Sequence, residues 1–387
     1  MKKIVFAAMT FLAALGCERV DHSGDFAPEP PAVALEDVAL ILSDIPIGTS
    51  QMKEVHDAVG SSSGNGYDDE YMMRDLFSSP GTGVGDDATK AEAREYEKPL
   101  KDMISEYVRS RTTKASVVSP EDFLSALESS DIQIYWPGWD KWDGETLPVV
   151  TFDPADGSSR NTGYRMLPDG SVDEIVVDEN MAAETPVWVV NRNDDSAYTS
   201  LEMLRRQDPS WGEGSGNIVI GRTKANAPCR TLLLKDFKAN RNYDTWFAGA
   251  SEFFVKCAAV EDFFATTEAE LKLYSPAITD FMIVVKRSEV GQVKPFNAVL
   301  VSQWSEQLGT CAFMITEDDG GTITSWKCSA EVKIKSKSYG FDISIPFNSR
   351  DDIVWRGQLS AKYFEKNSSR TGHFGDVELT FEIEEYQ

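Results

Sequence analysis

The chain has 387 residues, of which 41% are hydrophobic and 11% aromatic, and its net charge at pH 7 is −25. A chain of this length is too long to fold around one simple hydrophobic core and suits two or three domains. Its apolar and aromatic content excludes a disordered chain. Because the surplus of carboxylates repels phosphate backbones, we expect no nucleic-acid partner.

The first residues are organised as a secretory signal. Lys2 and Lys3 precede an apolar run over residues 4–15, and Gly16 ends this segment. A charged start, a short apolar stretch and a small residue at the cut predict that residues 1–16 form a signal peptide that is removed.

Residues 14–17, with the sequence Ala-Leu-Gly-Cys, resemble the lipobox of bacterial lipoproteins. Ala14 departs from that pattern, in which Leu is usual three residues before the cysteine. The resemblance implies a lipid on Cys17, which anchors the protein to a membrane outside the cytoplasm. Glu18 stands where an Asp commonly signals inner-membrane retention, so the resemblance favours the outer membrane. An ordinary signal peptide with a chance cysteine is the alternative.

Residues 17–33 form the lipidated cysteine and a predicted flexible tether. Residues 28–31 read Pro-Glu-Pro-Pro, and the preceding Asp, Ser and Gly residues also disfavour packing. Beyond this tether the sequence has no run of the ~20 apolar residues that a membrane-spanning helix needs. We therefore expect a folded body held beside the membrane.

Residues 34–130 carry apolar side chains at helical spacing, most clearly over residues 100–108. Ser119, followed by Pro120 and by an acid at position 122, predicts the start of another helix. Residues 60–64 match the G-x-S-x-G pattern of a serine nucleophile. They follow a helix and not a buried strand, so we interpret them as a polar loop and the match as chance.

From residue 131 the pattern changes to short strands separated by Asp, Gly and Pro, which predicts a β-rich middle domain over residues 131–222. Its first strand runs into a dense group of aromatic and acidic residues. These are Tyr135, Trp136, Trp139, Asp140, Trp142 and Asp143. Flat rings beside carboxylates can stack on a sugar and accept hydrogen bonds from its hydroxyls, so this group is a candidate glycan site. Packing of the indoles as a lid over the core is the alternative.

Residues 223–387 contain the longest alternations of apolar and polar residues. These runs cover 326–334, 339–347 and 377–383. Period-two alternation places one face of each strand on a core and the other in water, which predicts an antiparallel β-sandwich. The whole chain is therefore predicted to be α+β and mainly β, with a helical N-terminal region, a β-rich middle domain and this sandwich.

Residues 249–256 read Gly-Ala-Ser-Glu-Phe-Phe-Val-Lys and resemble the Gly-x-Ser-Asp-Pro-Tyr-Val-Lys strand motif of calcium-and-lipid-binding sandwiches of the C-two type. Glu252 replaces the usual Asp, Phe253 replaces the Pro, and Asp244 lies farther upstream than the family's first acid. The resemblance implies a sandwich in which Asp244 and Glu252 bind calcium. A strand that begins after a Gly-Ala-Ser turn, without a metal, is the alternative.

Cys311 and Cys328 flank residues 318–321, an Asp-Asp-Gly-Gly turn signal. Folding at this turn would place the two cysteines opposite each other on adjacent strands, where a disulfide is possible. Two buried free thiols are the alternative.

None of the catalytic motifs that the sequence matches has the structural context that its chemistry requires. The chain has three histidines, none at metal-ligand spacing to another His or Cys, which disfavours zinc. We therefore expect a binding or assembly module of the cell envelope, with glycan or another envelope protein as partner, no cofactor, and calcium as the one ion to consider. A hydrolase that acts on glycan or peptide through Asp and Glu pairs is the alternative.

Overall fold

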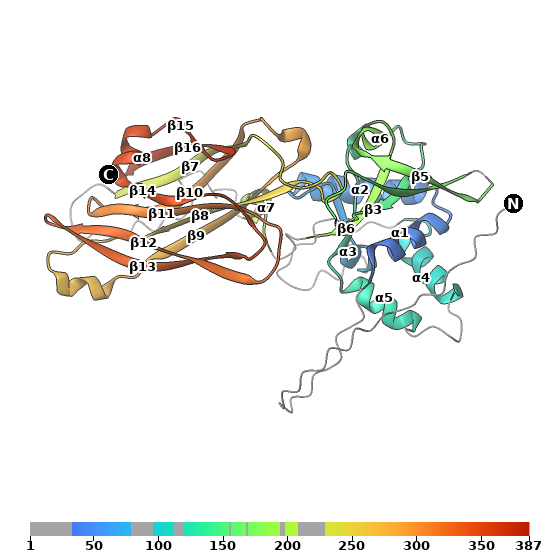
Figure 1. Cartoon of the computed structure of the whole chain (residues 1–387), viewed down its shortest axis with the longest axis horizontal. Coiled ribbons are helices and arrows are strands. Elements are labelled where there is room, and N and C mark those ends of the chain that lie inside the picture. Colours follow the sequence, from blue (N-terminus) through green and yellow to red (C-terminus); the bar gives the residue numbers. More distant parts are fainter. Residues whose placement is uncertain are drawn as a thin grey trace, which may run out of the picture.

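The computed structural model describes residues 33–78, 96–111, 119–154, 156–167, 169–193, 198–207 and 229–386. Cys17, the predicted signal peptide and nearly all of the predicted tether lie outside these residues, as does the predicted boundary near residue 222. The mainly β, α+β class is confirmed, with 28% helix and 42% strand. A smaller lobe with helices and a longer, mainly β lobe lie end to end (Figure 1). Within the described residues, no helix has the length and apolarity to cross a membrane.

The predicted helical region is present in the N-terminal lobe. Its helices are α1 (Leu35–Asp44), α2 (Thr49–Gly64), α3 (Met73–Phe77), α4 (Leu100–Arg111) and α5 (Pro120–Glu128). Ser119 caps α5 as predicted, because its Oγ accepts the backbone N–H of Asp122 at 3.1 Å.

The prediction of a loop at residues 60–64 was wrong, because these residues form the last part of α2. Glycine and serine disfavour helix, but tertiary packing overrides this preference here. Ser62 is buried, and a Cβ on Gly60 would lie 2.9 Å from the ring of Trp139. The absence of a side chain at Gly60 thus lets the indole lie against the helix.

A six-stranded sheet lies beside these helices, in the order β1-β2-β6-β3-β4-β5. Its strands are β1 (Glu70–Met72), β2 (Ile132–Tyr135), β3 (Val149–Phe152), β4 (Arg160–Met166), β5 (Val172–Asp178) and β6 (Val187–Arg192), with the short helix α6 (Glu179–Glu184) between the last two. Strands β3 and β6 pair in parallel, and the other neighbours are antiparallel. Helices and sheet share one hydrophobic cluster, which includes Leu42, Val55 and Ile104 from the helices and Trp188 from the sheet. The segments predicted as 34–130 and 131–222 therefore pack around a common core.

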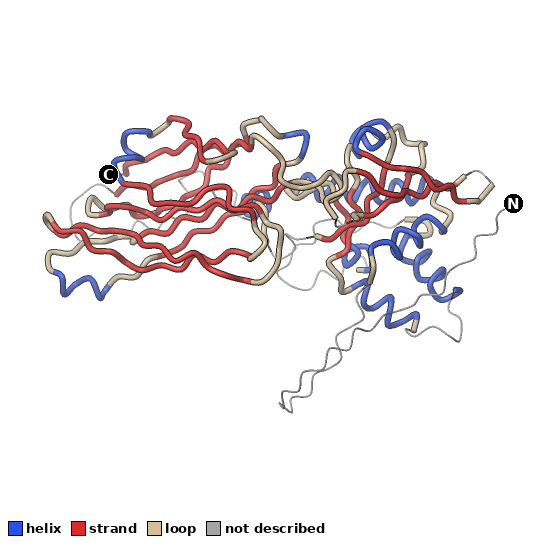
Figure 2. The backbone as a smooth tube through the Cα atoms, viewed as in Figure 1, coloured by secondary structure: helices blue, strands red, loops and turns tan. Residues whose placement is uncertain are grey.

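The C-terminal lobe is the predicted antiparallel sandwich (Figure 2). One sheet has the order β10-β7-β16-β15, and the other has the order β13-β12-β11-β8-β9 with β14 also paired to β11. The strands are β7 (Cys229–Ala239), β8 (Ser251–Ala259), β9 (Ala277–Val285), β10 (Lys294–Trp304), β11 (Leu308–Glu317), β12 (Ile323–Ile334), β13 (Lys337–Asn348), β14 (Asp352–Ser360), β15 (Arg370–Phe374) and β16 (Val377–Tyr386), with helix α8 (Ala361–Asn367) after β14. Fully buried phenylalanines from both sheets, including Phe237, Phe253 and Phe313, form the core between them.

The prediction that Cys311 and Cys328 face each other was wrong. Cys311 is in register with Leu359 of β14, and Cys328 is in register with Ile343 of β13. The cause is that β14 occupies most of the edge of β11 that a simple hairpin would give to β12. Cys257, Cys311 and Cys328 are free, and the Cys311 thiol contacts Cys257 instead.

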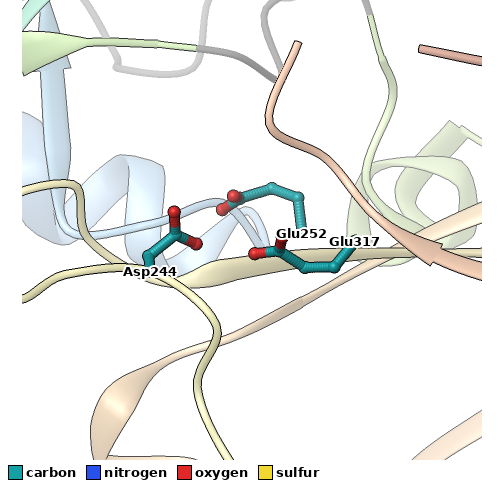
Figure 3. Close-up of side chains that lie close together, drawn as sticks. All are labelled: Asp244, Glu252 and Glu317. Carbon is teal, nitrogen blue, oxygen red and sulfur yellow. The ribbon is translucent and has the colours of Figure 1, made fainter. Parts of the chain in front are cut away.

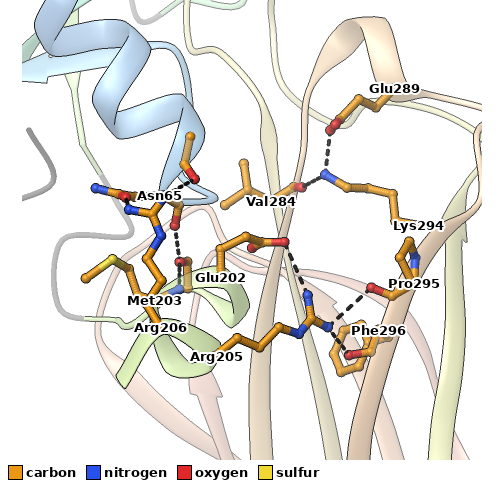
Figure 4. Close-up of polar contacts among 12 residues, drawn as sticks. Asn65, Glu202, Met203, Arg205, Arg206, Val284, Glu289, Lys294, Pro295 and Phe296 are labelled. Atoms are coloured by element: carbon orange, nitrogen blue, oxygen red, sulfur yellow. Dashed lines mark hydrogen bonds and ion pairs between the residues drawn. The ribbon is translucent and has the colours of Figure 1, made fainter. Parts of the chain in front are cut away.

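Helix α7 (Leu201–Gln207) lies between the two lobes and contacts both of them (Figure 4). Arg206 donates hydrogen bonds to Asn65 Oδ1 and, at 2.9 Å, to the backbone O of Gly64, at the end of α2. Arg205 donates to the backbone O of Phe296 in β10 at 2.6 Å. Two neighbouring arginines therefore tie this helix to different lobes.

Candidate functional site

Three carboxylates from separate segments meet at the end of the sandwich that faces the N-terminal lobe (Figure 3). Asp244 lies in the loop between β7 and β8, Glu252 is the second residue of β8, and Glu317 ends β11. The antiparallel pairing of Glu317 with Phe253 brings the end of β11 beside the start of β8. One ligand oxygen of each acid lies within 4.8 Å of the others. We call these three residues the carboxylate cluster.

Glu317 is the residue of the cluster whose carboxylate oxygens lack hydrogen bonds from the fold. Its side chain is fully buried, and neither carboxylate oxygen has a hydrogen-bond partner. Asp244 differs, because its Oδ2 accepts a hydrogen bond from Ser251 Oγ at 3.3 Å. A buried ionised carboxylate without a partner costs several kcal/mol, so Glu317 requires either a proton or a cation.

Two acids of the cluster, Glu317 and Asp244, have raised pKa values. Burial first, and then the neighbouring Asp244 carboxyl, raise the pKa of Glu317 to about 12. Burial also raises the pKa of Asp244 to about 6. Glu317 therefore keeps a proton at neutral pH unless a cation displaces it.

The donor atoms fit a hard divalent cation. Three carboxylates supply up to six oxygens, and calcium takes 6–8 oxygen ligands at about 2.3–2.6 Å. Two ligands of one such ion lie at most ~5 Å apart, and the cluster meets that limit. Nitrogen and sulfur ligands, which zinc prefers, are absent from these three residues.

Further acids surround the cluster. Asp318 follows Glu317, is buried, and accepts hydrogen bonds at Oδ1 from Gly320 N–H at 2.8 Å and Asn348 Nδ2 at 2.9 Å. Its Oδ2 has no partner. Asp351 lies beside it, and burial raises the pKa of Asp351 to about 7. These acids add carboxylate oxygens beside the cluster.

The structure brings together Asp244 and Glu252, the two residues predicted as calcium ligands, and adds Glu317. Glu317 was missed because the Thr-Glu-Asp-Asp-Gly-Gly segment was interpreted only as a hairpin turn. A signal was present there, since the C-two motif places further acids in a later loop. Only the pairing of β8 with β11 shows that this later segment lies beside the first.

The predicted aromatic group divides into buried and partly exposed members. Tyr135 and Trp136 are 4% and 1% exposed, so the core-lid alternative holds for both. Trp139 and Trp142 are partly exposed, as expected for a turn built on Pro and Gly. Trp139 Nε1 donates to Asp69 Oδ1 at 3.0 Å, which fixes the orientation of its ring.

The two acids of this group do not join the rings in one site. Asp140 is exposed. Asp143 accepts hydrogen bonds from the backbone N–H groups of Glu145 at 2.9 Å and Thr146 at 2.8 Å. The Thr146 hydroxyl and these N–H groups lower the pKa of Asp143 to about 2. Asp143 thus stabilises its own turn.

A cavity of about 330 Å³ opens beside Trp139. Its lining residues are His56, Asp57, Gly60, Ser61, Gly64, Asn65, Trp139 and Arg206. His56, expected to be structural, also packs against Trp139 with ring centroids 4.9 Å apart. Of the six residues predicted to contact a glycan, Trp139 is the one in this lining.

No protein-family model, curated protein or solved structure matches this chain. The resemblances at residues 14–17 and 249–256 therefore depend on those residues alone. The functional interpretation depends in the same way on the geometry of the carboxylate cluster and of the cavity.

Proposed function

We propose that this protein is an envelope lipoprotein whose C-terminal sandwich is a binding module for a divalent cation of the calcium class. The main support is that the Glu317 carboxylate is fully buried and its oxygens have no hydrogen-bond partner. Two further carboxylates, Asp244 and Glu252, point toward it (Figure 3). A doubly charged cation offsets the repulsion among the three acids and takes carboxylate oxygens of each as ligands.

Burial supports cation binding over the alternative of an acid-catalysed hydrolase. Glu317 is fully buried and Glu252 is 4% exposed. A glycan or peptide bond would have to reach these oxygens, whereas a dehydrated ion needs only a small space. Modules outside the cell commonly bind calcium with dissociation constants of ~10⁻⁴–10⁻³ M, which a site with three carboxylates and several waters can provide.

The proposed location follows from the lipobox resemblance. A lipidated Cys17 holds the body at a membrane outside the cytoplasm, and Glu18 favours the outer membrane. Two or more acyl chains are needed for stable anchoring, which a lipoprotein cysteine carries. The acidic body then stands beside the membrane as a cation-dependent binding or assembly module.

Calorimetric titration of calcium into the EDTA-treated lipidated chain in detergent tests the proposal. We expect saturable binding of one ion per chain, weakened at least tenfold by Glu317→Gln, which keeps the size of the side chain but removes its charge. Asp342→Asn is the matched control, because Asp342 is an exposed acid on β13 of the same sheet. No saturable binding by the parent chain, or equal binding by the Glu317 variant, would contradict the proposal.

A second candidate function is glycan binding in the cavity beside Trp139. The supporting observation is that a partly exposed indole there adjoins the polar side chains of Asp57, Asn65 and Arg206. Sugar recognition combines these features, with ring stacking on an aromatic face and hydrogen bonds at the edge. On a glycan array, Trp139→Ala should lose about 1–3 kcal/mol of binding free energy, whereas Trp142→Ala should bind as the parent does. An array without any bound glycan would remove this candidate.

A further inference from the structure

The loop over residues 240–250, between β7 and β8, connects the carboxylate cluster to the N-terminal lobe. Trp246 and Phe247 in this loop are 3% and 0% exposed. Both lie in a hydrophobic cluster with Val149, Val187 and Val189 of the six-stranded sheet. Residues of the sandwich lobe therefore complete part of the core of the other lobe.

Hydrogen bonds hold the same loop to the N-terminal lobe. Four of them cross between the lobes: Trp246 Nε1 to Ser159 O at 3.0 Å, Asn191 Nδ2 to Phe247 O at 3.0 Å and to Ala248 O at 2.7 Å, and Ala250 N–H to Asp68 Oδ2 at 3.0 Å. Asn191 and Asp68 are both buried, so these bonds are shielded from water. The position of the loop thus helps to fix how the two lobes fit together.

The carboxylate cluster lies where this loop leaves and rejoins the sandwich. Asp244 precedes Trp246 by two residues, and Glu252 follows Ala250 by two residues. One ligand oxygen of Glu317, from the neighbouring strand, lies within 4.8 Å of an oxygen of each of these two acids. One cation shared by acids from both sides holds the two sides together, and this link is absent when the ion is removed.

Polar pairs and a second apolar contact also join the lobes. In the apolar contact, Tyr67 of the N-terminal lobe shares a buried cluster with Phe254 and Met282 of the sandwich. Lys286, just after β9, pairs with Asp69 of the N-terminal lobe at 2.5 Å. Arg287 donates to Glu179 Oε1 of α6 at 2.9 Å and to the backbone O of Asp244 at 3.1 Å. Interfaces of this kind between domains permit relative motion unless an apolar contact secures them. Trp246 and Phe247 form one apolar contact of this kind, and their placement depends on the base of the loop.

We infer that cation binding at Asp244, Glu252 and Glu317 secures the N-terminal lobe to the sandwich through residues 240–250. This inference rests on the proposed cation site and adds its regulatory consequence. The bound ion holds the base of the loop closed, so Trp246 and Phe247 stay docked, and removal of the ion loosens the two lobes. Linkage is reciprocal, so docking of the loop also raises the affinity of the site for its ion.

Hydrogen–deuterium exchange of the full chain, with calcium or with EDTA, tests this coupling. In EDTA we expect exchange to be at least fivefold faster in residues 240–250 and in residues 187–193 of the N-terminal lobe. Helix α8, at the end of the sandwich away from that lobe, is the internal reference and should not change (Figure 1). In the Glu317→Gln variant, residues 240–250 and 187–193 should exchange at the same rate in calcium and in EDTA. In the Asp342→Asn variant, they should respond to calcium as in the parent chain.

A variant of the interface separates the coupling from the metal site. Asn191→Ala removes two hydrogen bonds to the loop but no proposed ligand. We expect it to bind calcium severalfold more weakly by calorimetry and to lose calcium-dependent protection in residues 187–193. If the parent chain binds calcium but exchange in residues 187–193 does not respond, the inference is overturned and the proposed cation site stands. If calorimetry detects no calcium binding, both fail.

Discussion

Glu317 at the end of β11 points toward Asp244 in the β7–β8 loop, and the ligand oxygens of the two acids lie within 4.8 Å of each other. The fold thus holds two acids together at a buried position where one of them has no hydrogen-bond partner. Such an arrangement is unfavourable for stability without a proton or an ion. This arrangement is the basis of the proposed cation site.

Calcium should raise the thermal stability of the protein through this site. An ion that binds only the folded state stabilises it by about 2.7 kcal/mol at a concentration one hundred times its dissociation constant. Glu317→Gln should abolish the increase in Tm while leaving the calcium-free protein at least as stable as the parent. Differential scanning calorimetry with calcium and with EDTA measures both effects. An unchanged calcium-dependent increase in the variant would place the ion elsewhere.

Stability should decrease with rising pH because of Glu54. This buried residue accepts a hydrogen bond from Leu100 N–H at 2.8 Å, and burial raises its pKa to about 7. The folded state therefore holds the proton more tightly than the unfolded state, whose carboxyl titrates near 4.5. The stabilising contribution is complete below about pH 4.5 and is lost by about pH 7, with a magnitude on the order of 3 kcal/mol.

Glu54→Gln should reduce this pH dependence, because the amide oxygen still accepts the Leu100 N–H and carries no charge. Urea unfolding of both proteins at pH 5 and pH 8 gives the comparison. The variant should gain stability over the parent at pH 8 and little at pH 5. Equal pH dependence in the two proteins would show that Glu54 titrates normally.

Thiol labelling should distinguish the cysteines that the structure describes. Cys257 and Cys311 are 1% and 0% exposed, whereas Cys328 is partly exposed. Contact with Cys311, followed by burial, raises the pKa of the Cys257 thiol well above its usual value, so the reactive thiolate is scarce. Iodoacetamide followed by peptide mass spectrometry should modify Cys328 first and the other two only after unfolding. A Cys311–Cys328 disulfide in the native protein would contradict the observed register.

Lipidation is predicted to depend on Cys17 alone. Cys17→Ser should abolish incorporation of labelled palmitate and release the protein from the membrane fraction or leave it uncleaved, because serine cannot form the thioether. Asp21→Asn in the predicted tether is a suitable control and should keep the label. Continued labelling of the Cys17 variant would refute the lipobox interpretation.

The sequence was most informative where structure follows from local periodicity. Alternation over residues 326–334 and 339–347 predicted strands because neighbouring side chains of a strand point to opposite faces. Asp244 and Glu252 were predicted together because they belong to one short segment. Ser119 was predicted as a cap because its hydrogen bond is made within the first turn of its helix.

Contacts between distant segments were not predictable in the same way. Glu317 joins the cluster only because β11 pairs with β8, and no local pattern specifies that partner. Cys311 does not lie opposite Cys328, because β14, which comes later in the chain, pairs with that edge of β11. Residues 60–64 have the composition of a loop, but the ring of Trp139 packs on Gly60 and the helix continues. In each case contacts between distant segments, and not the local sequence pattern, determine the structure.

A crystal structure of the chain grown with calcium would show whether these three acids bind an ion. We expect one ion bound by oxygens of Asp244, Glu252 and Glu317 at about 2.3–2.6 Å, with water completing its coordination. A structure at saturating calcium with no ion at these three residues, and with a protonated Glu317 hydrogen-bonded to Asp244, would contradict it.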